Sequence, residues 1–176
     1  MAIFEIVKRN PKDAKIPTRA TANSAGYDFT VCEQVIVHPY GETMELLKDF
    51  IAKRIPYTVN DFKAVVKDTT LRPTLVPTGI KCKLASDEYL QISVRSSTPL
   101  NNWIILANGV GIIDADYYEN ESNDGEIFFQ VINLSPVDII LQPGDKIGQG
   151  IIQKYIITED DTADGIRTGG FGSTGN

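Results

Sequence analysis

Short apolar runs recur along the chain, and each is bounded by glycine, proline, asparagine or aspartate. The runs are rich in valine, isoleucine, phenylalanine and tyrosine, which favour strands, and Gln142-Pro143-Gly144-Asp145 is a typical turn between two of them. This pattern predicts an all-β core. We expect strands near residues 3–7, 29–37, 74–80, 90–94, 104–107, 127–132, 137–141 and 151–157.

One segment departs from the strand pattern. Between residues 43 and 68 the apolar side chains follow helical spacing, first at Met44, Leu47 and Phe50 and again after a proline. We therefore expect two short helices, inserted into the β framework over residues 41–71. This insertion either packs its apolar face on the β core or binds a protein partner, and its pattern leaves both alternatives open.

The length of 176 residues suits one well-buried domain, so we expect a single domain over residues 1–176 with the insertion inside it. Apolar residues make up 42% of the chain and charged residues 23%, which is typical of a globular protein. The net charge of −6 and the pI near 4.8 argue against binding to a nucleic-acid backbone.

The sequence also carries no sign of export or membrane insertion. An apolar stretch of roughly 18 residues, the length of a membrane span, does not occur. The N-terminus lacks both a charged leader and a hydrophobic signal core. We therefore expect a cytoplasmic protein that does not associate with membranes.

The chain contains one histidine, His38, and two cysteines, Cys32 and Cys82. These numbers exclude a histidine-rich metal site, a multi-cysteine zinc site and a disulfide framework. Each cysteine stands in an apolar or strand-like stretch, where a reduced thiol usually packs as a small hydrophobe. Any chemistry must therefore come from carboxylates, arginines, hydroxyls and backbone amides, or from an ion that arrives with the substrate.

A first candidate site follows an apolar strand and a glycine-containing turn. In the segment from Val110 to Tyr118, the carboxylates of Asp114 and Asp116 stand beside aromatic residues. A carboxylate next to a closely approaching backbone can orient a water or accept its proton, and an aromatic ring can lie against a sugar or a base. The same residues also fit an ordinary hairpin with aspartates in turn positions.

Two further segments carry groups that suit phosphate oxygens. Arg95 ends a predicted strand and is followed by the hydroxyls of Ser96, Ser97 and Thr98. The C-terminal tail, residues 160–176, adds an arginine, hydroxyls and a phenylalanine among glycines, whose amides can approach an anion closely. A surface salt bridge and a flexible terminus are the simpler alternatives. Because neither a P-loop nor a dinucleotide fingerprint occurs, the phosphates would be held on β loops.

In order along the chain, five segments resemble the motifs of the homotrimeric dUTPases, the deoxyuridine triphosphate nucleotidohydrolases, of the Gram-positive bacterial or phage type. The segments are Ala25-Gly26-Tyr27-Asp28, Arg95-Ser96-Ser97, residues 108–117, Gly144-Asp145-Lys146-Ile147-Gly148-Gln149 and residues 167–175. The resemblance spans nearly the whole chain outside the predicted helices, and five ordered motifs are far more specific than any one of them.

The resemblance implies a fold, an assembly and an activity. The fold would be a jelly-roll-like, distorted β-barrel, and the protein would be a homotrimer whose active sites are shared, with the third and fifth motifs supplied by neighbouring subunits. The enzyme would hydrolyse dUTP to dUMP and pyrophosphate, which keeps uracil out of DNA and supplies dUMP for dTTP synthesis. Mg²⁺ would arrive with the triphosphate, and the tail over residues 160–176 would close over the site.

The resemblance also implies roles for single residues. Asp114 would activate the water that attacks the α-phosphorus, and Tyr117 would pack against the deoxyribose and leave no space for a 2′-hydroxyl. Asn108, with the hairpin backbone from Gly111 to Ile113, would bind the uracil edge.

Further roles concern the phosphates, the metal and the tail. Arg95, Ser96, Ser97 and Gln149 would hold phosphate oxygens, and Asp28 would meet Mg²⁺ through its water shell. In the tail, Phe171 would cover the uracil. The γ-phosphate would be bound there by a set of residues within the glycine-rich segment: Arg167, Gly172, Ser173 and Thr174.

Three features depart from the family pattern. After Tyr117 the common Arg-Gly is replaced by Tyr118-Glu119, and a longer acidic loop follows over residues 120–124. Arg167 lies four residues before Phe171 rather than the common five. The first and second motifs are also further apart than usual, because the helical segment lies between them.

Two other functions are compatible with parts of the sequence. The dCTP deaminases share this β fold and place a glutamate, as general acid and base, in the strand after the third motif. At that position this chain has Gln130, whose amide cannot exchange protons in that role. A nucleotide-sensing regulator would bind dUTP and, through the insertion, a protein. The full set of catalytic residue types favours the hydrolase over both.

Overall fold

The computed structural model describes residues 1–41, 48, 52, 72–167 and 170. In this part of the chain the elements are β1 (Ile3–Ile6), β2 (Thr18–Arg19), β3 (Tyr27–Thr30), β4 (Val35–Val37), β5 (Thr74–Pro77), β6 (Ile80–Lys83), β7 (Glu88–Val94), α4 (Ser97–Asn102), β8 (Ile104–Leu106), β9 (Gly111–Asp114), the 3-10 turn η1 (Ala115–Tyr117), β10 (Phe128–Asn133), β11 (Ile139–Leu141) and β12 (Lys146–Lys154). The prediction of a mostly β protein is confirmed.

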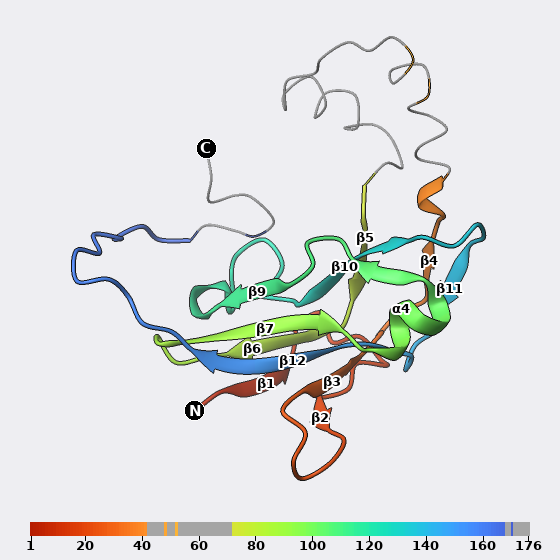
Figure 1. Ribbon diagram of the computed structural model, residues 1–176. Helices are drawn as coiled ribbons and strands as arrows, with labels where there is room; N and C mark the ends of the chain where they lie inside the picture. The colour runs from red at the N-terminus through yellow and green to blue at the C-terminus, as the bar shows by residue number, and fades with distance from the viewer. Residues whose placement is uncertain (42–47, 49–51, 53–71, 168–169, 171–176) are drawn as a thin grey trace.

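Two sheets form the body of the molecule (Figure 1). The larger contains five antiparallel strands in the order β2-β3-β12-β7-β9, and the smaller has the order β5-β10-β8. β12 is the central strand of the larger sheet. It pairs with β3 on one side and, on the other, with every residue of β7. The pairs β1-β6 and β11-β4 complete the β structure.

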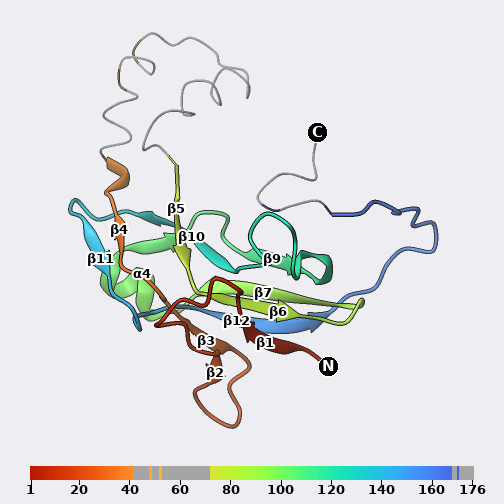
Figure 2. The same ribbon diagram turned by 180° about the vertical axis from the view of Figure 1, so that it is seen from behind.

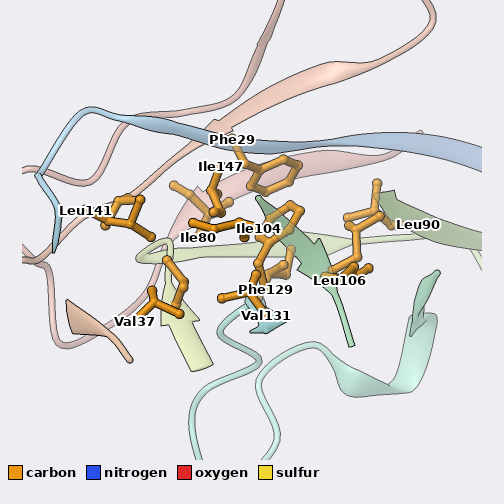
Figure 3. Packing of buried hydrophobic residues seen from close by; sticks show 14 of the residues in the cluster. Phe29, Val37, Ile80, Leu90, Ile104, Leu106, Phe129, Val131, Leu141 and Ile147 are labelled. Atoms are coloured by element: carbon orange, nitrogen blue, oxygen red, sulfur yellow. The ribbon is translucent and has the colours of Figure 1, made fainter. Parts of the chain in front are cut away.

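The hydrophobic core lies between the two sheets (Figure 3). Phe29 of β3 and Leu90 of β7 are fully buried, as are Phe129 and Val131 of β10. The rings of Phe29 and Phe129 lie 5.7 Å apart. A Cβ atom at Gly148 of β12 would lie 2.0 Å from the Phe129 ring, so glycine is required there. Burial of each such side chain contributes about 1.5–3 kcal/mol and holds the two sheets together.

The structure divides some of the predicted strands and moves others. The run over residues 29–37 forms β3 and β4, and the run over 74–80 forms β5 and reaches only the first residue of β6. The second division falls at Gly79, whose φ of 69° turns the chain. The last strand begins at Lys146 rather than near residue 151. Its glycines argued against a strand in the sequence pattern, but in the structure they let this strand pack closely on its neighbours. The sequence pattern did not predict β2, β9 or α4.

The helical insertion falls almost entirely outside the described residues. Strands β4 and β5, which flank it in sequence, lie side by side in both views (Figures 1 and 2). The segment therefore leaves and re-enters the fold at one place without interrupting either sheet. The two helices predicted between residues 43 and 68, and the protein partner considered for residues 41–71, stay predictions. In the described part of the chain, no helix is long and apolar enough to cross a membrane.

Candidate active site

A cavity of about 260 Å³ lies beside β9. It is bordered by apolar side chains of β7, β8 and β10, among them Ile92 and Leu106, and by the amide of Gln130. Many of the residues predicted for substrate binding and catalysis line it. These are Asn108, Gly111, Ile113, Asp114, Tyr117 and Arg167. The third motif and part of the fifth therefore meet at one cavity in a single chain.

The hairpin backbone borders the cavity because residue 111 is glycine. Gly111 of β9 lies opposite Ile92 of β7, and a Cβ atom at residue 111 would lie 2.5 Å from Cγ1 of Ile92. Any larger residue would push β9 away from β7. Since β9 is the edge strand of its sheet, its outer N–H and C=O groups have no strand partner in the described sheet. Those groups can bind the edge of a planar base.

Two carboxylates at the end of β9 hold one guanidinium. Nη2 of Arg167 donates to Oδ2 of Asp114 at 2.5 Å, and Nε donates to Oδ1 of Asp116 at 2.7 Å. The Asp114 side chain is half exposed, whereas that of Arg167 is 17% exposed. The same guanidinium lies 5.9 Å from the centre of the Tyr117 ring. Arg167 thereby joins the tail to the end of the third motif.

Tyr117 is buried, with 6% of its surface exposed, and its ring lines the cavity. Its hydroxyl donates to the carbonyl of Glu126 at 2.9 Å and accepts from Nδ2 of Asn123 at 2.6 Å. Burial raises the pKa of Tyr117, so the phenol stays protonated near neutral pH. In the tail, a Cβ atom at Gly170 would lie 2.6 Å from Cε2 of the ring, so only glycine allows this close approach.

A second group of predicted residues gathers between β3, β7 and β12. The Asp28 side chain, 12% exposed, lies 3.3 Å from Nε of Arg95 and 2.7 Å from Nζ of Lys146. Gln149 lies opposite Asp28 in the β12-β3 pairing, and its side chain covers Gly26 so closely that a Cβ atom there would lie 2.4 Å from Oε1. The first, second and fourth motifs therefore meet here.

The hydroxyls of the second motif stand at the start of α4. Ser96 is the N-cap residue and Ser97 the first helical residue, and both side chains are exposed. Ser96 makes no capping hydrogen bond, and its hydroxyl can turn toward a ligand at the end of β7. These serines thus adjoin Arg95 as the resemblance implied.

Asp114 and Arg95 lie toward opposite ends of β7. Asp114 pairs with Tyr89 near the start of this strand, whereas Arg95 directly follows Val94 at its end. Extended chain rises about 3.3 Å per residue, so roughly 20 Å separates the two positions. Neither side chain spans that distance, so Asp114 and Arg95 do not contact each other within one chain.

The acidic loop after Tyr117 is tied to β6 by a contact that nothing in the local sequence predicted. Lys81, only 4% exposed, lies 2.9 Å from Glu119 and 3.2 Å from Asp124, with the Tyr118 ring 4.9 Å from its ammonium. Burial lowers the pKa of Lys81, but the hydrogen bonds to the two carboxylates raise it by more, so the ammonium stays charged. A lysine that alternates with apolar residues in β6 carries no sign of partners 38 and 43 residues away.

Four predicted tail residues lie outside the described part of the chain: Phe171, Gly172, Ser173 and Thr174. Asn123 and Lys146 touch predicted site residues although sequence reasoning assigned them no role, and Asp116, a carboxylate of the first candidate segment, contacts Arg167. Lys146 at least stands within the fourth motif. The two cysteines are buried as expected, and burial raises the pKa of Cys32 and raises that of Cys82 to about 12. Neither is an activated nucleophile.

Comparison with known proteins identifies the family. The dUTPase family model matches residues 62–175. A deoxyuridine 5′-triphosphate nucleotidohydrolase of Lactococcus lactis subsp. lactis (strain IL1403) is 33% identical over 175 residues, which cover 98% of this chain and 96% of the relative. The chain belongs to the dUTPase family. Its relative in Helicobacter pylori (strain Shi470) is 31% identical over 179 residues and covers the same shares of the two chains.

Solved dUTPase structures agree with this membership. The crystal structure of dUTPase from Streptococcus mutans superimposes with a TM-score of 0.67 and 28% identity, over 89% of this chain and 98% of that one. A dUTPase from phage phi11 of S. aureus, at 13% identity, shares the fold with a TM-score of 0.63 over 96% of this chain and 99% of that one. The predicted family and fold class are confirmed.

The side chains suit a magnesium ion that arrives with its substrate. Within the described ranges, no three His, Cys, Asp or Glu side chains cluster to form a metal cage. Asp28 instead offers a single carboxylate beside Arg95 and Lys146. Because Mg²⁺ keeps several waters and favours phosphate oxygens, one carboxylate that meets its water shell fits this chemistry. A structure of a mutant dUTPase from phage phi11 of S. aureus reveals the coordination of a structural Mg(II) ion.

Proposed function

We propose that this dUTPase hydrolyses dUTP to dUMP and pyrophosphate by attack of a water on the α-phosphorus. The observation that supports this most directly is the cavity itself, where a half-exposed carboxylate, a buried tyrosine and an edge strand meet. Hydrolysis of a phosphoanhydride needs an oriented water and neutralised charge rather than a nucleophilic side chain. Asp114 can orient the water, and Arg95 and Arg167 can neutralise charge on the phosphates.

Asp114 is the catalytic residue in this proposal. Its carboxylate orients the attacking water and accepts its proton as the bond to phosphorus forms. Until substrate binds, the guanidinium of Arg167 contacts both Asp114 and Asp116 and holds that carboxylate in place. The electron pair of the breaking bond leaves with pyrophosphate, so the reaction needs no oxidant or covalent intermediate.

The cavity also accounts for the choice of nucleotide. Asn108 and the backbone from Gly111 to Ile113 bind the uracil edge, and the ring of Tyr117 lies against C2′ of the deoxyribose. A ribose hydroxyl at C2′ would collide with this ring, which is fixed at its hydroxyl end. UTP is therefore rejected by shape.

The phosphates bind at the second group of predicted residues, which surrounds Asp28. Their oxygens are held by Arg95, Ser96, Ser97 and Gln149. Mg²⁺, when bound with the triphosphate, neutralises charge on the phosphate oxygens, and Asp28 meets its water shell. From the tail, Phe171 covers the uracil, and Gly172, Ser173 and Thr174 bind the γ-phosphate. We also assign Arg167 to the γ-phosphate, which requires it to leave Asp114 when substrate binds.

The enzyme works as a homotrimer with shared sites. The support is the separation of about 20 Å along β7, because the base and water site at Asp114 must be paired with the phosphate site of another copy. Exposed apolar side chains on α4 and nearby, such as Leu100, Trp103 and Leu134, are consistent with contact between copies.

The test is a panel of dUTP, dTTP, dCTP and UTP, each with and without magnesium, read by pyrophosphate release. Selective cleavage of dUTP that depends on magnesium is the expected result. Comparable cleavage of UTP would contradict the role of Tyr117. Ammonia release from dCTP would instead support a deaminase, which the amide of Gln130 in the cavity disfavours.

A further inference from the structure

We infer that Asn123, in the acidic loop, is a positioning residue that sets the preference for dUTP over UTP by fixing the ring of Tyr117. This inference rests on the proposed role of Tyr117 against the deoxyribose. The residue belongs to the acidic loop over residues 120–124 that follows Tyr118-Glu119.

The amide of Asn123 can face Tyr117 in one orientation only. Its Oδ1 accepts hydrogen bonds from the backbone N–H of Gly125 at 3.1 Å and from Nδ2 of Asn120 at 2.8 Å. A backbone N–H can only donate, so the atom near Gly125 must be the oxygen. The NH₂ group is therefore the one that points to the Tyr117 hydroxyl, 2.6 Å away.

This orientation also decides the direction of the tyrosine hydrogen bonds. Because Nδ2 of Asn123 donates, Oη of Tyr117 accepts and must send its own proton elsewhere. The carbonyl of Glu126, 2.9 Å away, can only accept that proton. The hydroxyl thus accepts one hydrogen bond and donates another. Together the two hydrogen bonds resist rotation of the ring more than one would.

The loop around Asn123 is itself closed and anchored. Oδ1 of Asn120 accepts from the backbone of Ser122 and Asn123, and Nδ2 of Asn120 donates to the carbonyl of Tyr117 at 2.9 Å. Gly125 has a φ of 78°, and a Cβ atom there would lie 2.8 Å from that same carbonyl. The loop can therefore close against Tyr117 only with glycine at its end.

The buried ammonium of Lys81 fastens this loop to β6 through Glu119 and Asp124, which stand before and after Asn123. Gly170 of the tail lies against the Tyr117 ring near Cε2 and the hydroxyl. The ring is thus confined on one side by the tail and at its hydroxyl by the loop. A steric filter against one extra oxygen works only if the ring cannot tilt away, and the loop supplies that rigidity.

The experiment compares kcat/KM for dUTP and UTP in the same sample of enzyme. The ratio of the two values does not depend on the fraction of enzyme that is folded, so a merely structural loss leaves it unchanged. Asn123→Asp keeps the acceptor for Gly125 but replaces the donor to Tyr117 with a carboxylate oxygen, so the one phenol proton faces two acceptors and one of the two hydrogen bonds is lost. We expect it to lower the dUTP/UTP ratio about tenfold, the effect of one well-placed hydrogen bond.

Tyr117→Phe removes the hydroxyl and keeps the ring, so we expect a similar fall in the ratio. Adding Asn123→Asp to Tyr117→Phe should then change it by less than about twofold, because the two residues act through one bond. The control is Glu121→Gln, which alters the charge of the same loop at an exposed residue and should leave the ratio unchanged.

Tyr117→Ala separates the proposed role of Tyr117 as the sugar filter from the positioning role of Asn123. If it leaves the ratio unchanged, Tyr117 is not the sugar filter and the proposed function fails at that residue. If Tyr117→Ala lowers the ratio but Asn123→Asp does not, or if Asn123→Asp has its full effect in the Tyr117→Phe background, the positioning role of Asn123 is wrong.

Discussion

Arg167 in the C-terminal tail and Asp114 at the end of β9 are joined by an ion pair of 2.5 Å, although 53 residues separate them in sequence. The resemblance to the family placed Arg167 on the γ-phosphate, yet in the structure it lies on the proposed catalytic carboxylate. The altered spacing to Phe171 is consistent with this different reach. The contact makes the tail part of the water site before any nucleotide binds.

Asp114→Asn should abolish most of the activity. Asparagine keeps the shape of the side chain and loses both the charge and the ability to accept a proton. We expect kcat for dUTP to fall about 10³-fold, at the middle of the range for a positioned general base, while KM changes little. Pyrophosphate release measures it, and turnover at the parental rate would remove Asp114 from the mechanism.

Arg167→Lys should have an intermediate effect. Lysine keeps the charge but cannot contact Asp114 and Asp116 together with the fixed fork of a guanidinium. We expect kcat to fall between about 10-fold and 100-fold, because lysine cannot bind the γ-phosphate through two parallel N–H groups and so holds the tail less firmly.

Asp116→Asn tests the hydrogen bond between Arg167 and the second aspartate. It weakens the hold on Arg167 but leaves the pair with Asp114, so its effect should be the smallest of the three. A loss as large as that of Asp114→Asn would mean that Asp116 itself contacts the reacting water.

Lys81→Met should destabilise the protein by about 2 kcal/mol, the cost of losing charged hydrogen bonds at a buried position. Hydrogen bonding to Lys81 lowers the pKa of Glu119. Burial raises the pKa of Asp124, but hydrogen bonds from Lys8 and Lys81 lower it by more. These carboxylates therefore stabilise the fold above their ordinary pKa values of 4.5 and 3.8, and this stability is lost as the pH falls below them.

Urea unfolding of the parent and of Lys81→Met, between pH 7 and pH 3, measures this difference. The difference in the free energy of unfolding between the two proteins should become smaller as the pH falls. A gap that stays constant over this range would show that the carboxylates do not act through Lys81.

The thiols should be unreactive in the folded protein. Both cysteines are buried, and the pKa of Cys82 is raised to about 12, so almost no thiolate forms at pH 8. Iodoacetamide at pH 8 should leave the native chain unlabelled over an hour and label both cysteines after denaturation. Rapid labelling of the native protein would mean that the strands carrying the thiols open readily.

The sequence allowed the family, the fold class and the cavity residues to be predicted, because each motif is a local pattern. Asn108, Asp114 and Tyr117 lie within ten residues and were expected to share one site, as they do. Contacts between distant residues were beyond that reasoning. The bond from Lys81 to the acidic loop depends on how β6 lies beside it.

The distance between Asp114 and Arg95 along β7 could not be predicted for the same reason. Motif order in the sequence does not tell that Asp114 and Arg95 stand at opposite ends of one strand. That distance follows only from the register, in which Asp114 faces Tyr89. It also supports the proposed sharing of sites between subunits.

Complementation between two inactive variants tests the shared site most directly. Asp114→Asn and Arg95→Ala are each purified, mixed, unfolded and refolded together, and assayed for pyrophosphate release from dUTP. If each site takes Asp114 and Arg95 from different chains, about a quarter of the sites in randomly mixed trimers are intact, and activity should recover to about that fraction of the parental value. If the mixture stays as inactive as the two variants alone, both residues act within one chain, and the proposed assembly of the active site is wrong.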